Sequence, residues 1–182
     1  MKSITFVTGN ANKAAFLERN LGITLTHRSM DIVEIQSLDV AEVAAAKAKS
    51  AYAEVGGPVL VEDVSLVFTA LGQLPGPLVK WFLKDLGNER LCRLLDPFND
   101  RSAKHIVNYC LYDGQTARNF YGAVSGEIAN QPRDGDGWGF DAIFIPEGTD
   151  KTRAELSQEE QDQHSPRRLA VAALKKYLQT AG

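Results

Sequence analysis

A short apolar run at residues 4–7 opens the chain and predicts a β-strand. Leu17 and Leu21 then recur at helical spacing, and Gly22 closes the predicted helix. The residues between them, 8–13, are mostly small or polar. A strand, a polar loop and a helix start can bind phosphate, because free N–H groups at the helix start face an anion. A strand-to-helix turn with an Asn cap is also common without a ligand, so both interpretations stay open.

The remaining elements follow from the spacing of apolar residues and from capping patterns. Asp39 and Glu42 predict a capping box for a helix at residues 40–55. Alternating residues on either side of the Asp113-Gly114 turn predict a β-hairpin. Strands are expected at residues 23–26, 59–61, 105–112, 116–128 and 142–145, and further helices at 77–87, 88–95, after Ser157 and at 169–178. The apolar stripe of the last helix is expected at Leu169, Ala172, Ala173 and Leu178.

Two adjacent carboxylates interrupt the apolar run that begins at Val59. Residues 59–61 predict a short buried strand, and Glu62 and Asp63 follow it before the chain becomes apolar again. Asp and Glu are rarely buried without a partner or a metal. The pair therefore marks either a site where the strand emerges or an exposed strand end. Successive strand residues face opposite ways, so the two carboxylates are expected to differ in role, with one facing a ligand.

Residues 130–141 form a polar loop with three glycines around Trp138 and Phe140. Core packing explains aromatic residues in such a loop poorly. The loop is therefore expected to present a flat aromatic face to a base.

The composition narrows the class of protein. The 182 residues predict a single domain over 1–182, and 44% hydrophobic with 24% charged residues is ordinary for a globular protein. A net charge of -3 argues against a nucleic-acid partner. No apolar run is long enough for a membrane span, and the start of the chain lacks a signal-peptide core, so a cytoplasmic location is expected. Cys92 and Cys110 are expected to be buried and without chemistry.

Three features together point to a nucleoside polyphosphate as ligand. The loop at residues 8–13 would hold phosphates, the acids Glu34, Glu62 and Asp63 would hold Mg²⁺, and the loop around Trp138 would hold a base. Mg²⁺ prefers a few carboxylates together with substrate phosphates and retained waters. Acids on different segments suit that preference.

Several motifs resemble the inosine triphosphate pyrophosphatase family, and more closely its eukaryotic branch. They are residues 6–10 with Lys13, 57–63, 70–72, 74–77, 80–82 and 139–141, and they occur in the family's order and spacing over nearly the whole chain. The resemblance implies hydrolysis of ITP, dITP and XTP to the monophosphate and pyrophosphate, which cleanses the nucleotide pool. It also implies an elongated, two-lobed α/β fold with a long mixed β-sheet flanked by helices, a central nucleotide cleft and a homodimer.

The resemblance further implies roles for individual residues. Asp63 would be the base for an attacking water, and Glu34 and Asp63 would serve Mg²⁺, with Mn²⁺ as an alternative metal. Lys47, which alone would indicate a solvated helix face, would reach phosphates. The implied substrate-binding residues are Thr8, Gly9, Asn10, Ala11, Asn12, Lys13, Lys47, Val64, Lys80, Trp138, Gly139, Phe140, Asp141, Gln161, Pro166 and Arg167.

Two positions before the last helix depart from the family pattern. Gln161 stands where the family has a lysine that helps hold the nucleotide, and Pro166 stands where it has a histidine. In the family this histidine and the following arginine, here Arg167, read the purine's 6-oxo group. Proline has neither a side-chain nor a backbone hydrogen-bond donor, and His164 is the alternative donor. Altered base selectivity is therefore expected; the alternatives are a non-catalytic nucleotide-binding protein or a pyrophosphatase for a different modified nucleotide.

Overall fold

The computed structural model describes residues 3–22 and 25–180. Its strands are β1 (Thr5–Val7), β2 (Thr26–Arg28), β3 (Val59–Phe68), β4 (Pro75–Gly76), β5 (Ser102–Tyr112), β6 (Ala117–Ile128) and β7 (Phe144–Pro146). Its α-helices are α1 (Ala11–Leu21), α2 (Val40–Val55), α3 (Val79–Arg93), α4 (Gln158–Gln163) and α5 (Pro166–Thr180), with short 3-10 turns η1 (Thr69–Leu71) and η2 (Arg153–Glu155). In this part of the chain no helix has both the length and the apolar character needed to cross a membrane.

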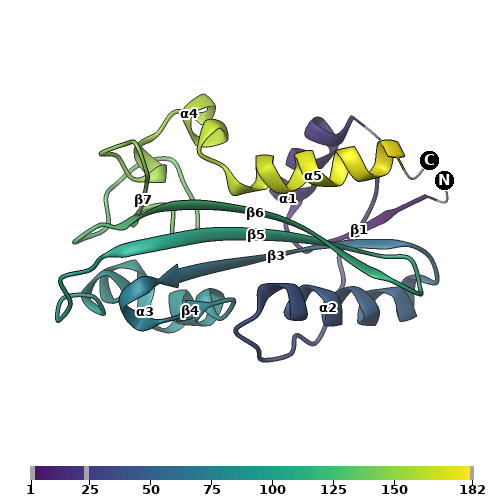
Figure 1. The fold of residues 1–182 in the computed structure, drawn as a ribbon, viewed down its shortest axis with the longest axis horizontal. Helices are drawn as coiled ribbons and strands as arrows, with labels where there is room; N and C mark the ends of the chain where they lie inside the picture. The colour runs from purple at the N-terminus through teal and green to yellow at the C-terminus, as the bar shows by residue number, and fades with distance from the viewer. Residues whose placement is uncertain (1–2, 23–24, 181–182) are drawn as a thin grey trace. The chain divides into compact units, whose positions relative to one another are not determined.

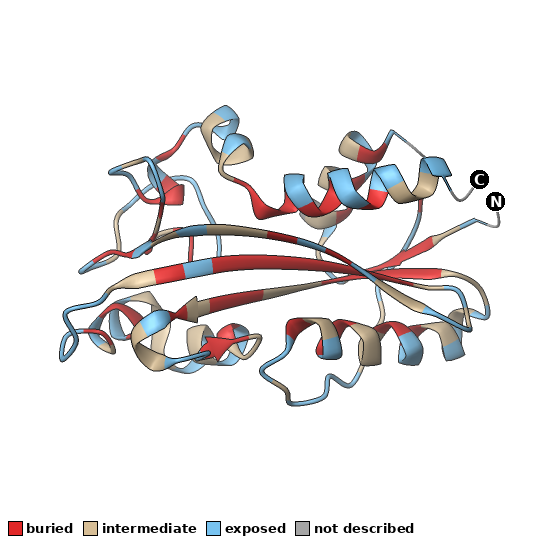
Figure 2. Cartoon of the chain, in the orientation of Figure 1, coloured by how far each residue is buried: buried red, intermediate tan, exposed pale blue. Residues whose placement is uncertain are grey.

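The strands form one mixed seven-stranded sheet in the order β2-β1-β3-β5-β6-β7, with β4 paired to β3 (Figure 1). The chain divides into two compact units. The first unit contains Met1–Asp63, Val107–Gly122 and Arg167–Gly182, and the second contains Val64–Ile106 and Ala123–Pro166. Strands β3, β5 and β6 contribute residues to both units, and β5 is buried along most of its length (Figure 2).

Each unit has its own hydrophobic core. In the first unit α2 packs small side chains such as Ala44 and Ala48 against Val61 of β3 and against Cys110. In the second unit the core includes Cys92. Both cysteines are buried and free, as expected from their apolar surroundings.

The parallel part of the sheet places β1 between two strands that follow it in the chain. β1 pairs in parallel with β2 on one side and with β3 on the other. Parallel neighbours need crossover connections, which α1 and α2 supply from opposite sides of the sheet (Figure 1). The carboxyl end of β1 therefore lies at a topological switch point, where open α/β sheets bind their ligands.

The local capping predictions are largely confirmed. Helix α2 has the expected bounds, the Asp39 side chain accepts from the backbone N–H groups of Ala41 and Glu42, and Gly56 ends the helix in the left-handed conformation with φ 72°. The Glu42 carboxylate, however, accepts from the Ser37 hydroxyl at 2.6 Å. The hairpin β5-β6 and the capping box of α4 are also present as predicted.

The strand that carries the two carboxylates is longer than predicted. It continues through Glu62 and Asp63 to Phe68. The acids therefore lie inside a strand, so the predicted strand end is wrong and Glu62 is not exposed; that the pair marks a site stays a prediction. The sheet can continue here because Glu62 has its own cationic partners, described below.

The last helix begins earlier than predicted and faces the core differently. It starts at Pro166, and its buried residues include Ala170, Val171 and Leu174, whereas Leu169 is 53% exposed. The predicted stripe is therefore wrong. Of the strand expected at residues 23–26, residues 23 and 24 lie outside the described part of the chain, and β2 begins at Thr26.

Candidate functional site

The loop after β1 turns directly into α1 and carries the predicted residues Thr8, Gly9, Asn10, Ala11 and Lys13. The Thr8 hydroxyl accepts from the Asn10 backbone N–H at 3.1 Å, and the Asn10 side chain accepts from the Lys13 backbone N–H at 3.4 Å. The Thr8 N–H donates to the Arg28 carbonyl at 3.1 Å. These contacts fix the loop at the carboxyl end of β1. The side chain of Asn12 lies outside the described part of the chain.

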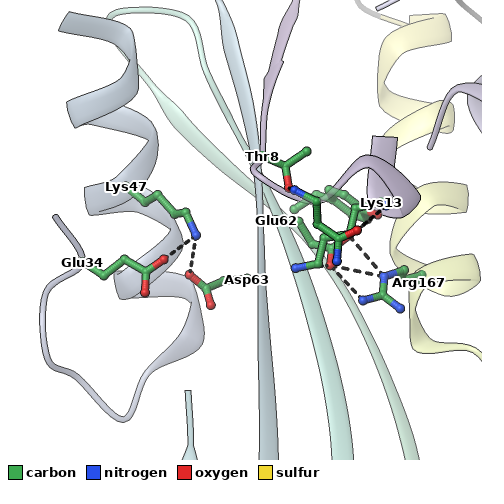
Figure 3. Close-up of polar contacts among 9 residues, drawn as sticks. Thr8, Lys13, Glu34, Lys47, Glu62, Asp63 and Arg167 are labelled. Carbon is green, nitrogen blue, oxygen red and sulfur yellow. Dashed lines mark hydrogen bonds and ion pairs between the residues drawn. The ribbon is translucent and has the colours of Figure 1, made fainter. Parts of the chain in front are cut away.

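Glu62 is the centre of a buried charge cluster on one face of β3 (Figure 3). Its side chain is fully buried, and Oε1 lies 3.0 Å from Nζ of Lys13. The guanidinium of Arg167, in the first turn of α5, donates to both Glu62 oxygens at 3.1–3.2 Å. The Tyr109 hydroxyl donates to Oε2 at 2.6 Å. One carboxylate therefore binds cations from two helices, α1 and α5.

The cluster strongly favours the ionised form of Glu62. Burial raises the pKa of a carboxyl, but Arg167 and Lys13 lower the pKa of Glu62 to about 2. Burial together with the adjacent carboxylate raises the pKa of Tyr109 well above its ordinary range. Tyr109 therefore stays protonated and remains a hydrogen-bond donor.

Asp63 belongs to a second cluster, on the face of β3 toward α2 (Figure 3). Nζ of Lys47, on α2, lies 2.6 Å from Oε1 of Glu34 and 3.7 Å from Oδ2 of Asp63. Burial lowers the pKa of Lys47, but Asp63 and Glu34 outweigh it, so the pKa is raised. Lys47 is 18% exposed and bridges two carboxylates, so the solvated helix face that its position alone would indicate is wrong.

The two clusters confirm that the adjacent carboxylates face opposite ways. Strand alternation directs Glu62 toward Lys13 and Arg167, and Asp63 toward Lys47 (Figure 3). The register pairs Val7 of β1 with Val61, so both acids follow directly after the β1–β3 ladder. The clusters therefore lie near the carboxyl end of β1.

The cluster around Asp63 has the donor chemistry of a shared Mg²⁺ site. Oxygens of Glu34 and Asp63 converge on one position, which the ammonium of Lys47 occupies. Mg²⁺ is typically held by one or two carboxylates together with substrate phosphates and waters. Among residues 3–22 and 25–180, no group of three or more His, Cys, Asp or Glu side chains is placed to hold a metal. The carboxylate pair fits Mg²⁺, but not as a closed protein cage.

In the second unit, Asp141 anchors the glycine-rich loop. Its Oδ2 accepts from the Trp138 backbone N–H at 3.2 Å, and its Oδ1 accepts from Nε of Arg153 at 3.0 Å. The Asn88 side chain donates to the Gly139 carbonyl at 2.9 Å. The predicted residues Trp138, Gly139 and Asp141 therefore share one hydrogen-bonded loop.

The two aromatic residues of this loop differ in their surroundings. Phe140 is 7% exposed and packs edge-to-face on His105, with ring centroids 4.9 Å apart. Core packing therefore explains Phe140, and the expectation that its ring faces a base is wrong. Trp138 is 49% exposed. Of the pair, Trp138 keeps the exposed aromatic surface that base stacking needs.

Two of the three loop glycines, Gly135 and Gly137, are explained by close packing against the η2 turn and Asp141. A Cβ added at Gly135 would lie 2.0 Å from the Ala154 carbonyl oxygen, and one at Gly137 would lie 2.7 Å from Cβ of Asp141. Only glycine lets the loop approach the turn this closely.

We expect Gly135→Ala to lower the free energy of unfolding by about 1–3 kcal/mol, because the backbone must move to relieve the clash. Chemical denaturation measures the change. Gly57→Ala is the control: an added Cβ there meets nothing within 4 Å, so stability should change by less than about 1 kcal/mol. Equal stability of the two variants would contradict the packing explanation.

The remaining predicted residues also lie in the second unit. Gln161 donates through Nε2 to the carbonyls of Asp136 and Leu156, each at 3.0 Å. Pro166 is buried at the first position of α5. Nζ of Lys80 lies 5.5 Å from the ring centroid of Trp81. Val64 follows Asp63 in β3.

Tyr109 and Arg153 contact predicted site residues but were not themselves predicted. Tyr109 lies in the alternating pattern of β5, where nothing in the sequence separates it from a core residue. For Arg153 the sequence does hold a local signal. Thr152 and Glu155 have the spacing of a capping box, which predicts a helical turn at Arg153, and the structure forms this box around η2.

Comparison with known proteins shows the family to which the chain belongs. The Ham1 family model matches residues 4–177. A protein of Scheffersomyces stipitis named inosine triphosphate pyrophosphatase is 42% identical over 98% of both chains, and inosine triphosphate pyrophosphatase 2 of Trypanosoma cruzi is 40% identical over 94% of this chain and 90% of its own. The solved HAM1 protein of Coxiella burnetii superposes with a TM-score of 0.89 at 25% identity, covering 99% of this chain and 100% of that one.

Proposed function

Because the chain belongs to the Ham1 family, we propose that it is an inosine triphosphate pyrophosphatase that hydrolyses ITP, dITP and XTP to the monophosphate and pyrophosphate. The observation that carries the proposal is the pair of charge clusters on β3, near the carboxyl end of β1. The eukaryotic relatives named above support the substrate class.

The first cluster suits a polyanionic substrate. Lys13 supplies a positive charge beside the loop that holds Thr8 and Asn10, and Glu62 fixes its ammonium. Helix α1 begins at Ala11, so its first N–H groups lie in the same loop. We assign residues 8–13 to the triphosphate, with Lys47 and Lys80 as further phosphate contacts.

The second cluster suits metal-dependent hydrolysis. Glu34 and Asp63 would hold Mg²⁺, with Mn²⁺ as the alternative. The ion, when bound, would neutralise charge that develops on the phosphates. Asp63 would orient a water and accept its proton.

The base would be recognised by the second unit. Trp138 offers an exposed ring for stacking, and we assign Gly139, Asp141 and Val64 to positioning the base, whereas the buried Phe140 anchors the loop on His105. We also propose the two lobes and nucleotide cleft implied by the resemblance, a homodimer and a cytoplasmic location.

Altered base selectivity is proposed because of the hydrogen-bond donors near Gln161 and Pro166, the two positions that differ from the family pattern. The Gln161 side-chain amide donates to the Asp136 and Leu156 carbonyls, and Arg167 donates to Glu62. Selective sites reject analogues strongly only when their donors are available to the substrate. The alternative of a pyrophosphatase for a different modified nucleotide is favoured over a non-catalytic binding protein, because Glu34, Lys47 and Asp63, the residues proposed for hydrolysis, are all present and in contact.

A substrate panel tests the proposal. The purified protein is incubated with Mg²⁺ and ITP, XTP, dUTP, GTP or ATP, and the products are separated by ion exchange. We expect monophosphate from ITP and XTP, with a smaller preference over GTP than a site with the lysine and histidine would give. No monophosphate from any nucleotide would refute the proposal, and stabilisation by ITP without hydrolysis would support the non-catalytic alternative.

A further inference from the structure

Arg153 is a buried cation in the second unit. It opens the η2 turn, and 6% of its side chain is exposed. A buried charge is costly unless hydrogen bonds and an opposite charge compensate it. The partners of the guanidinium therefore indicate its function.

The Arg153 side chain joins the glycine-rich loop to the end of α4. Nε donates to Oδ1 of Asp141 at 3.0 Å. Nη1 donates to the carbonyl oxygens of Gln161 and His164, at 3.3 and 3.2 Å. Since Asp141 also accepts from the Trp138 N–H, the guanidinium fixes Trp138 indirectly. One side chain thus connects the loop proposed to bind the base with the segment that departs from the family pattern.

The turn that carries Arg153 is itself fixed on the same loop. The Ala154 N–H donates to the backbone carbonyl of Asp141 at 3.0 Å. The Thr152 N–H donates to the Glu155 carboxylate at 2.7 Å and closes the turn. The guanidinium is therefore held in place, and its planar fork reaches several acceptors that a single ammonium could not reach together.

We propose that Arg153 is a positioning residue for base recognition, an inference that rests on the proposed function. It acts through Asp141 and through the carbonyls at the end of α4, and so sets the position of the segment from Trp138 to Asp141.

The test is Arg153→Lys, which keeps the charge but not the fork. We expect KM for ITP to rise about tenfold and kcat to change by less than about twofold, because the base-binding segment shifts by a fraction of an ångström. The preference for ITP over ATP should fall. The inhibition constant of inorganic pyrophosphate should stay the same, since we assign phosphate binding chiefly to the first unit.

Arg133→Lys is the matched control. Arg133 also holds this region, donating to the Asp150 carbonyl at 2.7 Å and to Glu155 at 3.3 Å, but it makes neither of the contacts that define the proposal. Its KM and selectivity should match those of the wild type. A folded Arg153→Lys with wild-type KM and selectivity, even at a lower melting temperature, would show that Arg153 is only structural and would overturn the proposal.

A double-mutant cycle tests the route through Asp141 and covers a failure of the single variant to fold. Asp141→Asn combined with Arg153→Met removes both charges, so no buried charge is left unpaired. We expect its KM for ITP to exceed that of Asp141→Asn alone by clearly less than tenfold, because Arg153 acts in part through Asp141. A further rise of tenfold or more, or wild-type KM in the double variant, would overturn the proposal.

Failure of the proposed function would be recognised separately. If the wild type hydrolyses no nucleotide of the panel, the proposed activity fails, and the Arg153 variants are compared by calorimetric binding of ITP. About tenfold weaker ITP binding by Arg153→Lys than by the wild type supports the positioning role, and equal binding, or none by the wild type, contradicts it.

Discussion

Replacing Asp63 with Asn is expected to lower kcat for ITP about 1000-fold, within the range that removal of a general base produces. Asparagine has the shape of aspartate but cannot accept a proton from water, and it is a weaker ligand for Mg²⁺. It also leaves Lys47 with Glu34 as its acidic partner at 2.6 Å, so the helix α2 contact is retained. Product formation by ion exchange and circular dichroism measure turnover and fold together.

Glu54→Gln provides the control for this change. Glu54 is an exposed carboxylate on the same helix as Lys47, and its replacement removes one negative charge from the same unit. Its turnover should equal that of the wild type. Near-normal turnover in a folded Asp63→Asn variant would remove Asp63 from the hydrolytic centre.

Replacing Glu62 with Gln is expected to lower the free energy of unfolding by about 3–5 kcal/mol, because it leaves two cations without their buried counter-charge. Lys13 and Arg167 both contact the carboxylate, whose side chain is fully buried. The Tyr109 hydroxyl would also lose a charged acceptor at 2.6 Å. Denaturation with urea at neutral pH measures the change.

The same variant should lose part of the protein's acid sensitivity. The pKa of Glu62 is lowered from 4.5 to about 2, so its contribution is present above pH 4.5 and is lost as pH falls toward 2. This shift corresponds to about 3 kcal/mol. Glu62→Gln should therefore show a shallower decrease in stability between these pH values than the wild type.

An exposed ion pair serves as the control for Glu62. Glu89 pairs with Arg93 at 2.7 Å across one helical turn, and both side chains are mostly exposed. Glu89→Gln should cost less than about 0.5 kcal/mol. If Glu62→Gln cost no more than Glu89→Gln, the buried cluster would not stabilise the fold as described.

Local signals in the sequence predicted much of the fold. Asp39 and Gly56 predicted the first and last residues of α2 correctly, and the Asp113-Gly114 turn predicted the hairpin. Strand alternation also separated Glu62 from Asp63 correctly. Each of these features depends on neighbours in the chain, which the sequence displays directly.

Features that depend on distant partners were missed. β3 continues through two carboxylates because Lys13 and Arg167, remote in the chain, compensate Glu62. Phe140 looked like a ligand contact because its core partner His105 lies on β5, remote in the chain. The phase of α5 is set by tertiary packing, which a stripe of apolar residues cannot specify alone.

Phosphorus NMR of ITP incubated with the protein and Mg²⁺ tests the proposed function most directly. We predict that the ITP signals are replaced by those of IMP and pyrophosphate in equal amounts, because cleavage occurs between the α- and β-phosphates. Asp63→Asn, run in parallel, should leave ITP largely unconverted. Formation of IDP and inorganic phosphate, or unchanged ITP with the wild-type protein, would contradict a pyrophosphatase.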